Sequence, residues 1–221
     1  MRCALTSLAA CIGVSLGLLT ACGGGGSSGG TPLPNDPDFV PTTGPIAVTE
    51  LATGLPNPWS LAFLPDGRML VTGRLGSLRL HAANGAFQGN ISGLPAADSG
   101  GQGGLLDVVV DPAFATNRRI YFSFSERDPG NASLNGTAVA RAELDTGALA
   151  LVNVQVIYQQ LPKVAGSGHF GSRLAFDRDG HLFVTLGDRQ SNDQRVFAQD
   201  LNRGNGKVAR ITTSGAPAPG N

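Results

Sequence analysis

The sequence predicts an all-β protein built from radially arranged, four-stranded sheets. From about residue 45 onward, apolar residues recur with period two in short runs separated by Asp-Gly, Asn-Gly and Pro-containing turns, which is typical of successive antiparallel strands. The segment 61–72 recurs at 174–185 with seven of twelve positions identical, and Asp107–Ser123 has a related strand, Asp-Pro, strand form. Three related units, about fifty residues apart, indicate the blades of a β-propeller. A two-sheet β-sandwich would give a similar strand pattern without the repeat, and it is the alternative at this point.

The period-two runs define the strands that we expect. They are Ser60–Phe63, Met69–Thr72, Leu78–His81, Leu105–Val110, Ile120–Glu126, Ala138–Glu143, Val154–Gln159, Arg173–Phe176, Leu182–Leu186 and Lys207–Thr212. Helical periodicity is nearly absent, and only the stretch from Asp193 to Leu201 is compatible with a turn of helix.

The number of blades predicts a longer protein. About 175 ordered residues make three to three and a half blades, whereas propellers close with four to eight blades. A propeller left open would expose blade edges and part of its core, which favours aggregation. We therefore expect residues 45–221 to be the N-terminal half of a propeller domain, in a chain that is a fragment of a longer protein.

The N-terminus predicts export and a lipid anchor. Residues 1–21 combine one basic residue, a short apolar stretch and small residues before Cys22, as in a secretory signal peptide. Leu19-Thr20-Ala21-Cys22 is similar to a bacterial lipobox, so we expect Cys22 to be lipidated and to hold the protein on the periplasmic side of a membrane, the outer membrane in our interpretation. An ordinary signal peptide is the alternative. Residues 22–44 are rich in Gly, Ser and Pro and are expected to form a flexible tether.

The charge balance argues against nucleic acid as a partner. Sixteen basic and sixteen acidic residues cancel, and no run of like charge could follow a phosphate backbone or an anionic membrane. Contact with a membrane is therefore expected through the lipid anchor only.

Three glycine-rich polar turns contain the residues best suited to chemistry. They are Gly100–Leu106, Gly166–Arg173 and Leu186–Arg189. None has the spacing of a dinucleotide-binding motif or a P-loop. Glycine lets a backbone approach a ligand closely, so Gln102 and His169 are candidates at one mouth of the propeller channel. A histidine there can accept a proton near neutral pH if a carboxylate fixes its tautomer. Asp188 ends the neighbouring strand, so we expect it to lie close enough to His169 to be that carboxylate.

Other polar residues have plainer interpretations. Asp177-Arg178-Asp179-Gly180 is similar to part of a calcium loop but lacks the later glutamate, so we interpret it as a hairpin turn. We assign no role to His81 or His181, and we expect no metal ligand in this chain.

Five blocks of sequence, in order, resemble the soluble quinoprotein sugar dehydrogenases, also known as glucose/sorbosone or aldose sugar dehydrogenases. The resemblance runs from about Leu51 to Thr212. Its blocks are Asn57–Gly67, Gly101–Leu106 with Asp111-Pro112, His169–Leu174, Gly187-Asp188 and Gly206–Val208. The family fold is a six-bladed β-propeller, so this chain would supply about three blades.

The resemblance implies an activity and assigns site residues. Family members oxidise an aldose at C1 to the lactone, transfer a hydride to pyrroloquinoline quinone (PQQ) and pass electrons to an external acceptor. By position, His169 matches the general base that also contacts the cofactor, Gln102 a cofactor-binding residue, and Asp188 the carboxylate that orients the histidine. The arginine block that binds PQQ and the Gly-Pro pair that binds Ca²⁺ are expected downstream of residue 221. A non-catalytic propeller used as a binding module, or an inactive truncated fragment, is the alternative.

Overall fold

The computed structural model describes residue 44 and residues 46–220. The signal peptide, Cys22 and nearly all of the proposed tether lie outside these residues. The chain divides into two units, residues 1–47 and 48–221, and every strand belongs to the second unit. Within the described part of the chain, no helix has the length and apolarity needed to cross a membrane.

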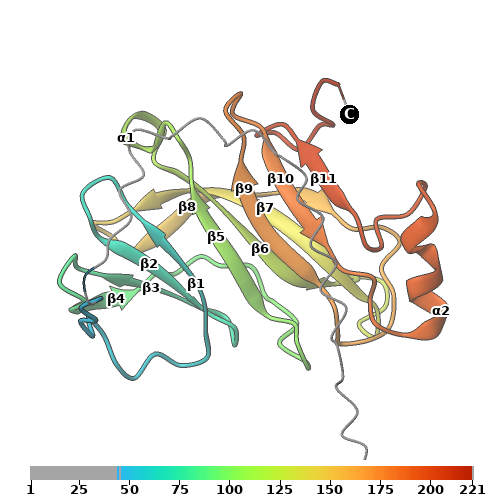
Figure 1. The fold of residues 1–221 in the computed structure, drawn as a ribbon, viewed down its shortest axis with the longest axis horizontal. Helices are drawn as coiled ribbons and strands as arrows, with labels where there is room; N and C mark the ends of the chain where they lie inside the picture. Colours follow the sequence, from blue (N-terminus) through green and yellow to red (C-terminus); the bar gives the residue numbers. More distant parts are fainter. Residues whose placement is uncertain (1–43, 45, 221) are drawn as a thin grey trace, which may run out of the picture. The chain divides into compact units, whose positions relative to one another are not determined.

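Three antiparallel sheets make up the second unit (Figure 1). Sheet A contains β1 (Pro58–Phe63), β2 (Met69–Gly73), β3 (Ser77–His81) and β4 (Phe87–Asn90). Sheet B contains β5 (Leu105–Val110), β6 (Arg119–Arg127), β7 (Asn135–Asp145) and β8 (Ala150–Gln159). Sheet C contains β9 (Gly171–Phe176), β10 (Leu182–Leu186) and β11 (Val208–Ile211). The short helices are α1 (Phe114–Asn117), α2 (Asn192–Arg195) and η1 (Val196–Gln199).

The sheets follow one another along the chain, and each is a simple meander from β1, β5 or β9 outward. The innermost strands are neighbours, because β1 contacts β5 and β5 contacts β9. This is the blade arrangement that the internal repeat predicts, and three separate sheets rule out the two-sheet sandwich for the described residues. The repeated segments 61–72 and 174–185 are β1–β2 and β9–β10 with their turns, and Asp107–Ser123 lies in β5 and β6.

The inner strands of sheet B are buried on both faces, so β6 and β7 are almost continuously buried, whereas the outer strand β8 is largely exposed. Large rings at Phe122 and Phe124 lie opposite Ala140 and Ala138 in the register of β6 with β7. These residues belong to the core shared with sheet A, whereas their neighbours Tyr121 and Val139 belong to the core shared with sheet C. Because successive side chains of a strand point to opposite faces, one pair of strands supplies both cores.

The repeat also fixes how the sheets are aligned at one end, which we name the mouth. It is the end at which β1, β5 and β9 begin and β2, β6 and β10 finish. In each sheet the first strand has a bulge near the mouth, where one backbone N–H donates to a hydroxyl of the second strand. The N–H of Ser60 donates to Thr72 (2.9 Å), that of Asp107 to Ser123 (3.0 Å) and that of Arg173 to Thr185 (2.8 Å). Thr72 and Ser123 also donate to carbonyl oxygens of the next sheet, those of Leu106 (2.6 Å) and Ser172 (2.7 Å). Neighbouring innermost strands are thereby held level with one another at the mouth.

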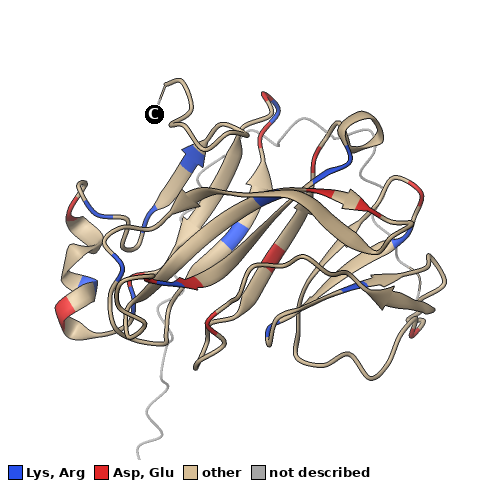
Figure 2. Ribbon diagram, turned by 180° about the vertical axis from the view of Figure 1, so that it is seen from behind, with Lys and Arg blue, Asp and Glu red and all other residues tan. Residues whose placement is uncertain are grey.

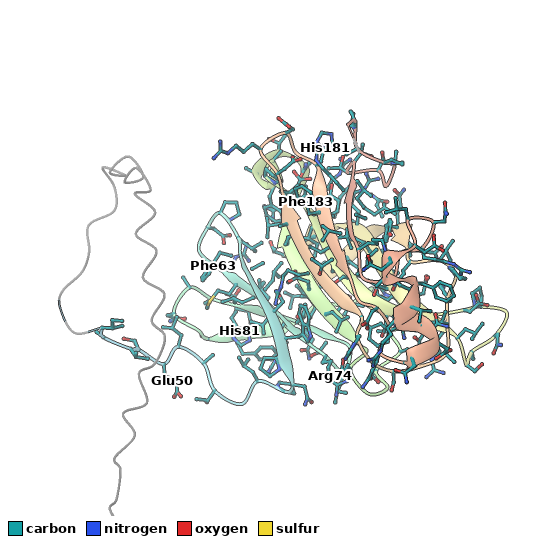
Figure 3. The ribbon with its side chains drawn as sticks, turned by 45° about the vertical axis from the view of Figure 1, so that its right-hand side comes forward. Glu50, Phe63, Arg74, His81, His181 and Phe183 are labelled. Carbon is teal, nitrogen blue, oxygen red and sulfur yellow. The ribbon has the colours of Figure 1, made fainter. Side chains whose placement is uncertain are left out.

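The views from other sides locate this end in the molecule. Arg74, directly after β2, and His181, in the turn between β9 and β10, lie at opposite ends in Figure 3. Basic and acidic residues are interspersed over strands and loops in Figure 2.

Candidate active site

His169 and Asp188 meet because they extend the two strands of one hairpin. Gly171 of β9 pairs with Leu186 of β10, His169 lies two residues before that pair, and Asp188 lies two residues after it. Their side chains are joined by a bond of 2.8 Å between Nδ1 of His169 and Oδ1 of Asp188. The imidazole is 44% exposed and the carboxylate 32% exposed, so the pair opens to solvent at the mouth.

The carboxylate determines the tautomer of the imidazole. The backbone N–H of Gln190 donates to Oδ1 of Asp188 (2.8 Å), and this bond, followed by the bond from His169, holds the pKa of Asp188 below its ordinary value. An ionised carboxylate only accepts hydrogen bonds, so Nδ1 of His169 carries the proton that it donates. The lone pair of Nε2 is then available on the other side of the ring.

Gln102 is tied to the same loop as His169. Its side-chain Oε1 accepts from the backbone N–H of His169 (2.8 Å), and the backbone N–H of Gln102 donates to the carbonyl oxygen of Ser167 (2.7 Å). Because Oε1 is bound to the backbone of His169, the amide N–H groups are the hydrogen-bonding groups of this side chain that remain for a ligand. The structure thus brings together Gln102, His169 and Asp188, the three residues singled out from the sequence.

Glycine is required where these loops touch. A Cβ on Gly187 would overlap the carbonyl oxygen of His169, and a Cβ on Gly104 would overlap that of Arg74. Gly104 also has a φ of +135°, a conformation that side chains disfavour. The glycine-rich composition of the turns is therefore explained by close backbone approach.

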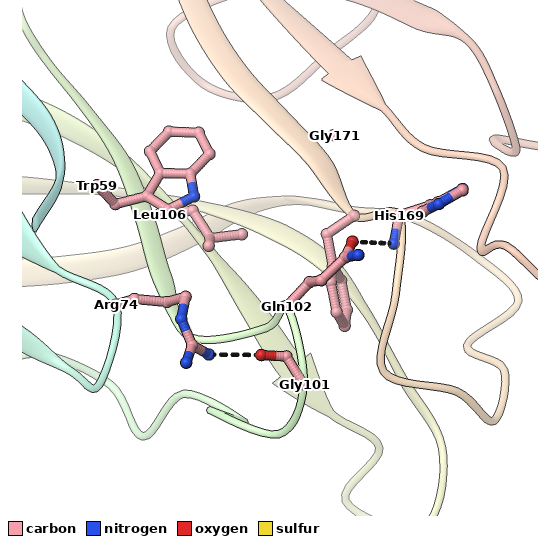
Figure 4. A pocket seen from close by; sticks show the side chains of 8 residues that line it. Trp59, Arg74, Gly101, Gln102, Leu106, His169 and Gly171 are labelled. Atoms are coloured by element: carbon pink, nitrogen blue, oxygen red, sulfur yellow. Dashed lines mark hydrogen bonds between the residues drawn. The ribbon is translucent and has the colours of Figure 1, made fainter. Parts of the chain in front are cut away.

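A pocket of about 400 Å³ lies between these residues (Figure 4). Its apolar lining comes from Trp59, Leu106 and Phe170, and its polar groups come from Gln102, His169 and Arg74. The volume and the mixture of a few polar groups with apolar side chains are typical of sites for small organic ligands.

Arg74 was missed by the sequence analysis. Its Nη1 donates to three carbonyl oxygens of the loop that carries Gln102, those of Ser99 (3.1 Å), Gly101 (2.7 Å) and Gly103 (2.8 Å). No carboxylate lies within ion-pair distance of Arg74 among the described residues. Arg189, which follows Asp188 directly, was missed as well. An arginine at a turn with carbonyl partners far along the chain has no recognisable spacing, so the sequence offered no signal for either residue.

The turn at Asp177–Gly180 lies at the other end of β9 and β10. Asp177, Asp179 and His181 form the one group of three potential metal ligands found in the described part of the chain. The Asp177 carboxylate accepts from the backbone N–H groups of Asp179 (2.9 Å) and His181 (2.8 Å) and pairs with Arg210 (2.7 Å). These contacts support the interpretation as a hairpin turn.

Comparison with known proteins identifies the family. The sequence profile described as "Glucose / Sorbosone dehydrogenase" matches residues 55–221. The chain belongs to this family. The match covers most of the residues from which the resemblance was drawn, and the three sheets are accordingly blades of its β-propeller fold.

Relatives of the family agree with this assignment. The chain is 44% identical over 172 residues to aldose sugar dehydrogenase YliI of Escherichia coli (strain K12), covering 77% of this chain and 45% of that protein. It matches a crystal structure of a glucose dehydrogenase with a TM-score of 0.73 and 43% identity, covering 79% and 49% of the two chains. It matches the PQQ-bound form of aldose sugar dehydrogenase from Streptomyces coelicolor with a TM-score of 0.69 and 29% identity, covering 79% and 50%. The chain thus spans about half the length of the relatives it matches.

Proposed function

We propose that this member of the glucose/sorbosone dehydrogenase family takes part in the PQQ-dependent oxidation of an aldose at C1 to the lactone, with His169 as general base. The observation that carries the proposal is the bond from Nδ1 of His169 to Asp188, which leaves Nε2 as a proton acceptor beside the pocket.

The reaction requires a base at this point. Oxidation at C1 removes a hydride from carbon and a proton from the C1 hydroxyl, and loss of the hydride alone would leave a costly protonated carbonyl. Nε2 of His169 accepts the hydroxyl proton, and the ionised Asp188 stabilises the imidazolium that forms. When bound, PQQ supplies the quinone that takes up the hydride, and its electrons pass to an external acceptor.

The pocket residues fit this cofactor. PQQ is a planar quinone that carries carboxylates, so it needs N–H donors at its edge and apolar surface against its rings. Gln102 and Arg74 provide donors, His169 also borders the pocket, and Trp59 and Phe170 provide apolar surface. Relatives named as aldose sugar dehydrogenases, one of them in a PQQ-bound form, support the same substrate and cofactor. The residues that would hold Ca²⁺ are those expected beyond residue 221.

The first experiment tests for the activity. The protein, as its gene encodes it, is incubated with PQQ and Ca²⁺, and glucose and other aldoses are added while the absorption of the quinone is followed. We expect bleaching of the quinone with at least one aldose. No change with any sugar would contradict the enzyme and favour the alternative of a binding module.

The second experiment tests the base. His169→Gln should lower kcat by about a hundredfold or more, because loss of a general base typically costs that much. The matched control is His181→Gln, which changes a histidine at the far end of β9 and β10 and should leave kcat within about twofold. A His169→Gln variant that keeps its rate within about tenfold would refute the assignment.

Export and anchoring are part of the same proposal. The lipobox at Leu19–Cys22 supports lipidation of Cys22 and a periplasmic location at the outer membrane. Cys22→Ser should move the protein from the membrane fraction to the soluble fraction of the cell envelope. Unchanged partitioning would argue against the anchor.

A further inference from the structure

Arg189 is a fully buried arginine beside the proposed catalytic pair. It is 2% exposed, and no carboxylate lies within 4.0 Å of its guanidinium among the described residues. Burial lowers its pKa to about 10, so it is still a cation at neutral pH. A buried cation is costly unless hydrogen bonds replace its hydration, so its partners indicate why it is there.

The first set of partners surrounds His169 along the chain. Nε donates to the carbonyl oxygen of Gly168 (3.2 Å), and Nη2 donates to that of Gly166 (2.8 Å). The guanidinium carbon lies 4.1 Å from the centre of the Phe170 ring. His169 itself has a φ of +47°, a conformation that persists in a non-glycine residue only where its surroundings enforce it. Arg189 holds the residues on both sides of that strained position.

The second set of partners leads to the other loop of the mouth. Nη1 and Nη2 donate to the backbone oxygen (3.0 Å) and the side-chain oxygen (2.6 Å) of Asn135. The amide of Asn135 donates in turn to Oδ2 of Asp98 (2.9 Å), and Asp98 accepts from the backbone N–H of Gly100 (3.2 Å). Gly100 begins the turn that carries Gln102. A buried chain of hydrogen bonds therefore joins the loop of His169 to the loop of Gln102. It runs from Arg189 through Asn135 to Asp98.

We propose that Arg189 is a positioning residue, which holds the His169 loop directly and the Gln102 loop through Asn135 and Asp98. The planar guanidinium bonds oxygens of Gly166, Gly168 and Asn135 at once, and a lysine ammonium on a flexible stem does not reproduce that fork. Arg189→Lys therefore keeps the charge and removes the geometry. The effect on catalysis rests on the proposed function, whereas the effect on the orientation of His169 does not.

The decisive experiment compares Arg189→Lys with Arg141→Lys. Arg141 is half-buried and, like Arg189, has oxygen partners, those of Thr213 (2.9 Å) and Gln155 (2.6 Å), but it lies in the body of sheet B. Nitrogen-15 NMR reports the tautomer of His169, which is assigned with His169→Gln as the reference. We expect the wild type and Arg141→Lys to show the Nδ1–H tautomer, and Arg189→Lys to show a mixture with a substantial share of Nε2–H.

Kinetics of the PQQ-loaded protein give a second readout. A misplaced base lowers the rate of the chemical step, so Arg189→Lys should lower kcat tenfold or more while KM for the sugar stays within about threefold. A folded Arg189→Lys variant with an unchanged tautomer and a kcat within twofold of wild type would overturn the proposal. If the wild type oxidises no sugar, the proposed function fails, and the tautomer alone still decides the role of Arg189.

A second variant covers the case in which Arg189→Lys does not fold. Asn135→Ser leaves the bonds from Arg189 to Gly166 and Gly168 in place but interrupts the link to Asp98. It should weaken PQQ binding at least fivefold, measured by fluorescence quenching, while His169 keeps its tautomer. Unchanged PQQ binding by folded Asn135→Ser would overturn the link between the two loops.

Discussion

Asp107 offers the sharpest test of how the three sheets are held together. Its carboxylate is 2% exposed and lies on β5, the innermost strand of sheet B. It accepts from the hydroxyl of Ser60 in sheet A (2.5 Å), from the guanidinium of Arg173 in sheet C (2.9 Å), and from the backbone N–H groups of Leu174 (2.7 Å) and Val108 (3.0 Å). One side chain therefore bonds all three sheets.

The size of the effect of Asp107→Ala follows from which donors lose their partner. The N–H groups of Val108 and Leu174 are buried, and each unsatisfied buried donor costs about 1–3 kcal/mol. The Ser60 hydroxyl can rotate, and Arg173 is exposed enough to bond water, so both lose little. We expect the free energy of unfolding to fall by about 4 kcal/mol.

Urea denaturation measures this loss. With a slope of about 2 kcal/mol per molar urea, the midpoint should fall by about 2 M. Asp145→Ala is the matched control, since Asp145 also accepts two backbone N–H groups, those of Gly147 and Ala148, but at an exposed turn where water replaces it. Asp145→Ala should therefore lower the urea midpoint much less than Asp107→Ala does. A fall of under about 0.5 M for Asp107→Ala would refute the reasoning.

Three further predictions test the mouth and the core. Gly187→Ala should lower the melting temperature by several degrees, because the added Cβ overlaps the His169 carbonyl and overpacking typically costs about 1–3 kcal/mol. Burial raises the pKa of Tyr121 to about 12 and raises that of Tyr158 as well, so ultraviolet titration at pH 10.5 should show less tyrosinate in the folded protein than in the protein unfolded in urea. The stability due to the neutral phenol of Tyr121 is present below about pH 10 and is lost as the pH rises toward 12. Arg74→Gln removes the guanidinium that bonds three carbonyl oxygens of the loop carrying Gln102. It should weaken PQQ binding about tenfold, measured by fluorescence quenching, because the loop is then less well positioned.

Each of these has its own control. Gly147→Ala adds a methyl group at an exposed turn and should leave the melting temperature unchanged, so an equal fall in both variants would contradict the overlap argument. For the tyrosines, ionisation near pH 10 in the folded state, as in urea, would contradict their burial. Arg79→Gln removes an arginine from the next strand and should bind PQQ normally. Normal binding by Arg74→Gln as well would show that its three carbonyl bonds are dispensable.

Most of the strands could be predicted because their alternation reports burial. β5 and β10 have the predicted bounds, and the others differ by a few residues at their ends. β4 (Phe87–Asn90) was missed, since it is an edge strand with no buried residue and thus no alternation to detect. α1 (Phe114–Asn117) was missed because a single turn of helix is too short to show a period. The turn of helix expected between Asp193 and Leu201 corresponds to α2 and η1.

The candidate site was partly predictable for a different reason. Gln102, His169 and Asp188 stand at strand ends among glycines, so the pattern of the chain already singles them out. Arg189 bonds Asn135, 54 residues away along the chain, and such a contact depends on how sheets B and C pack. No local pattern encodes that packing, so the residues that hold the site were found only in the structure.

The β9–β10 hairpin makes the separation of His169 and Asp188 a matter of counting residues. Each residue of a strand adds about 3.4 Å and reverses the face of the side chain, so deleting one residue between Leu182 and Leu186 would draw Asp188 back along β10 and turn it away from the imidazole. Substitutions that keep the strand length leave the spacing intact. Designed variants of this family should therefore keep the length of the hairpin constant while its side chains are varied. Variants that change the length of β10 should lose the hydrogen bond between His169 and Asp188.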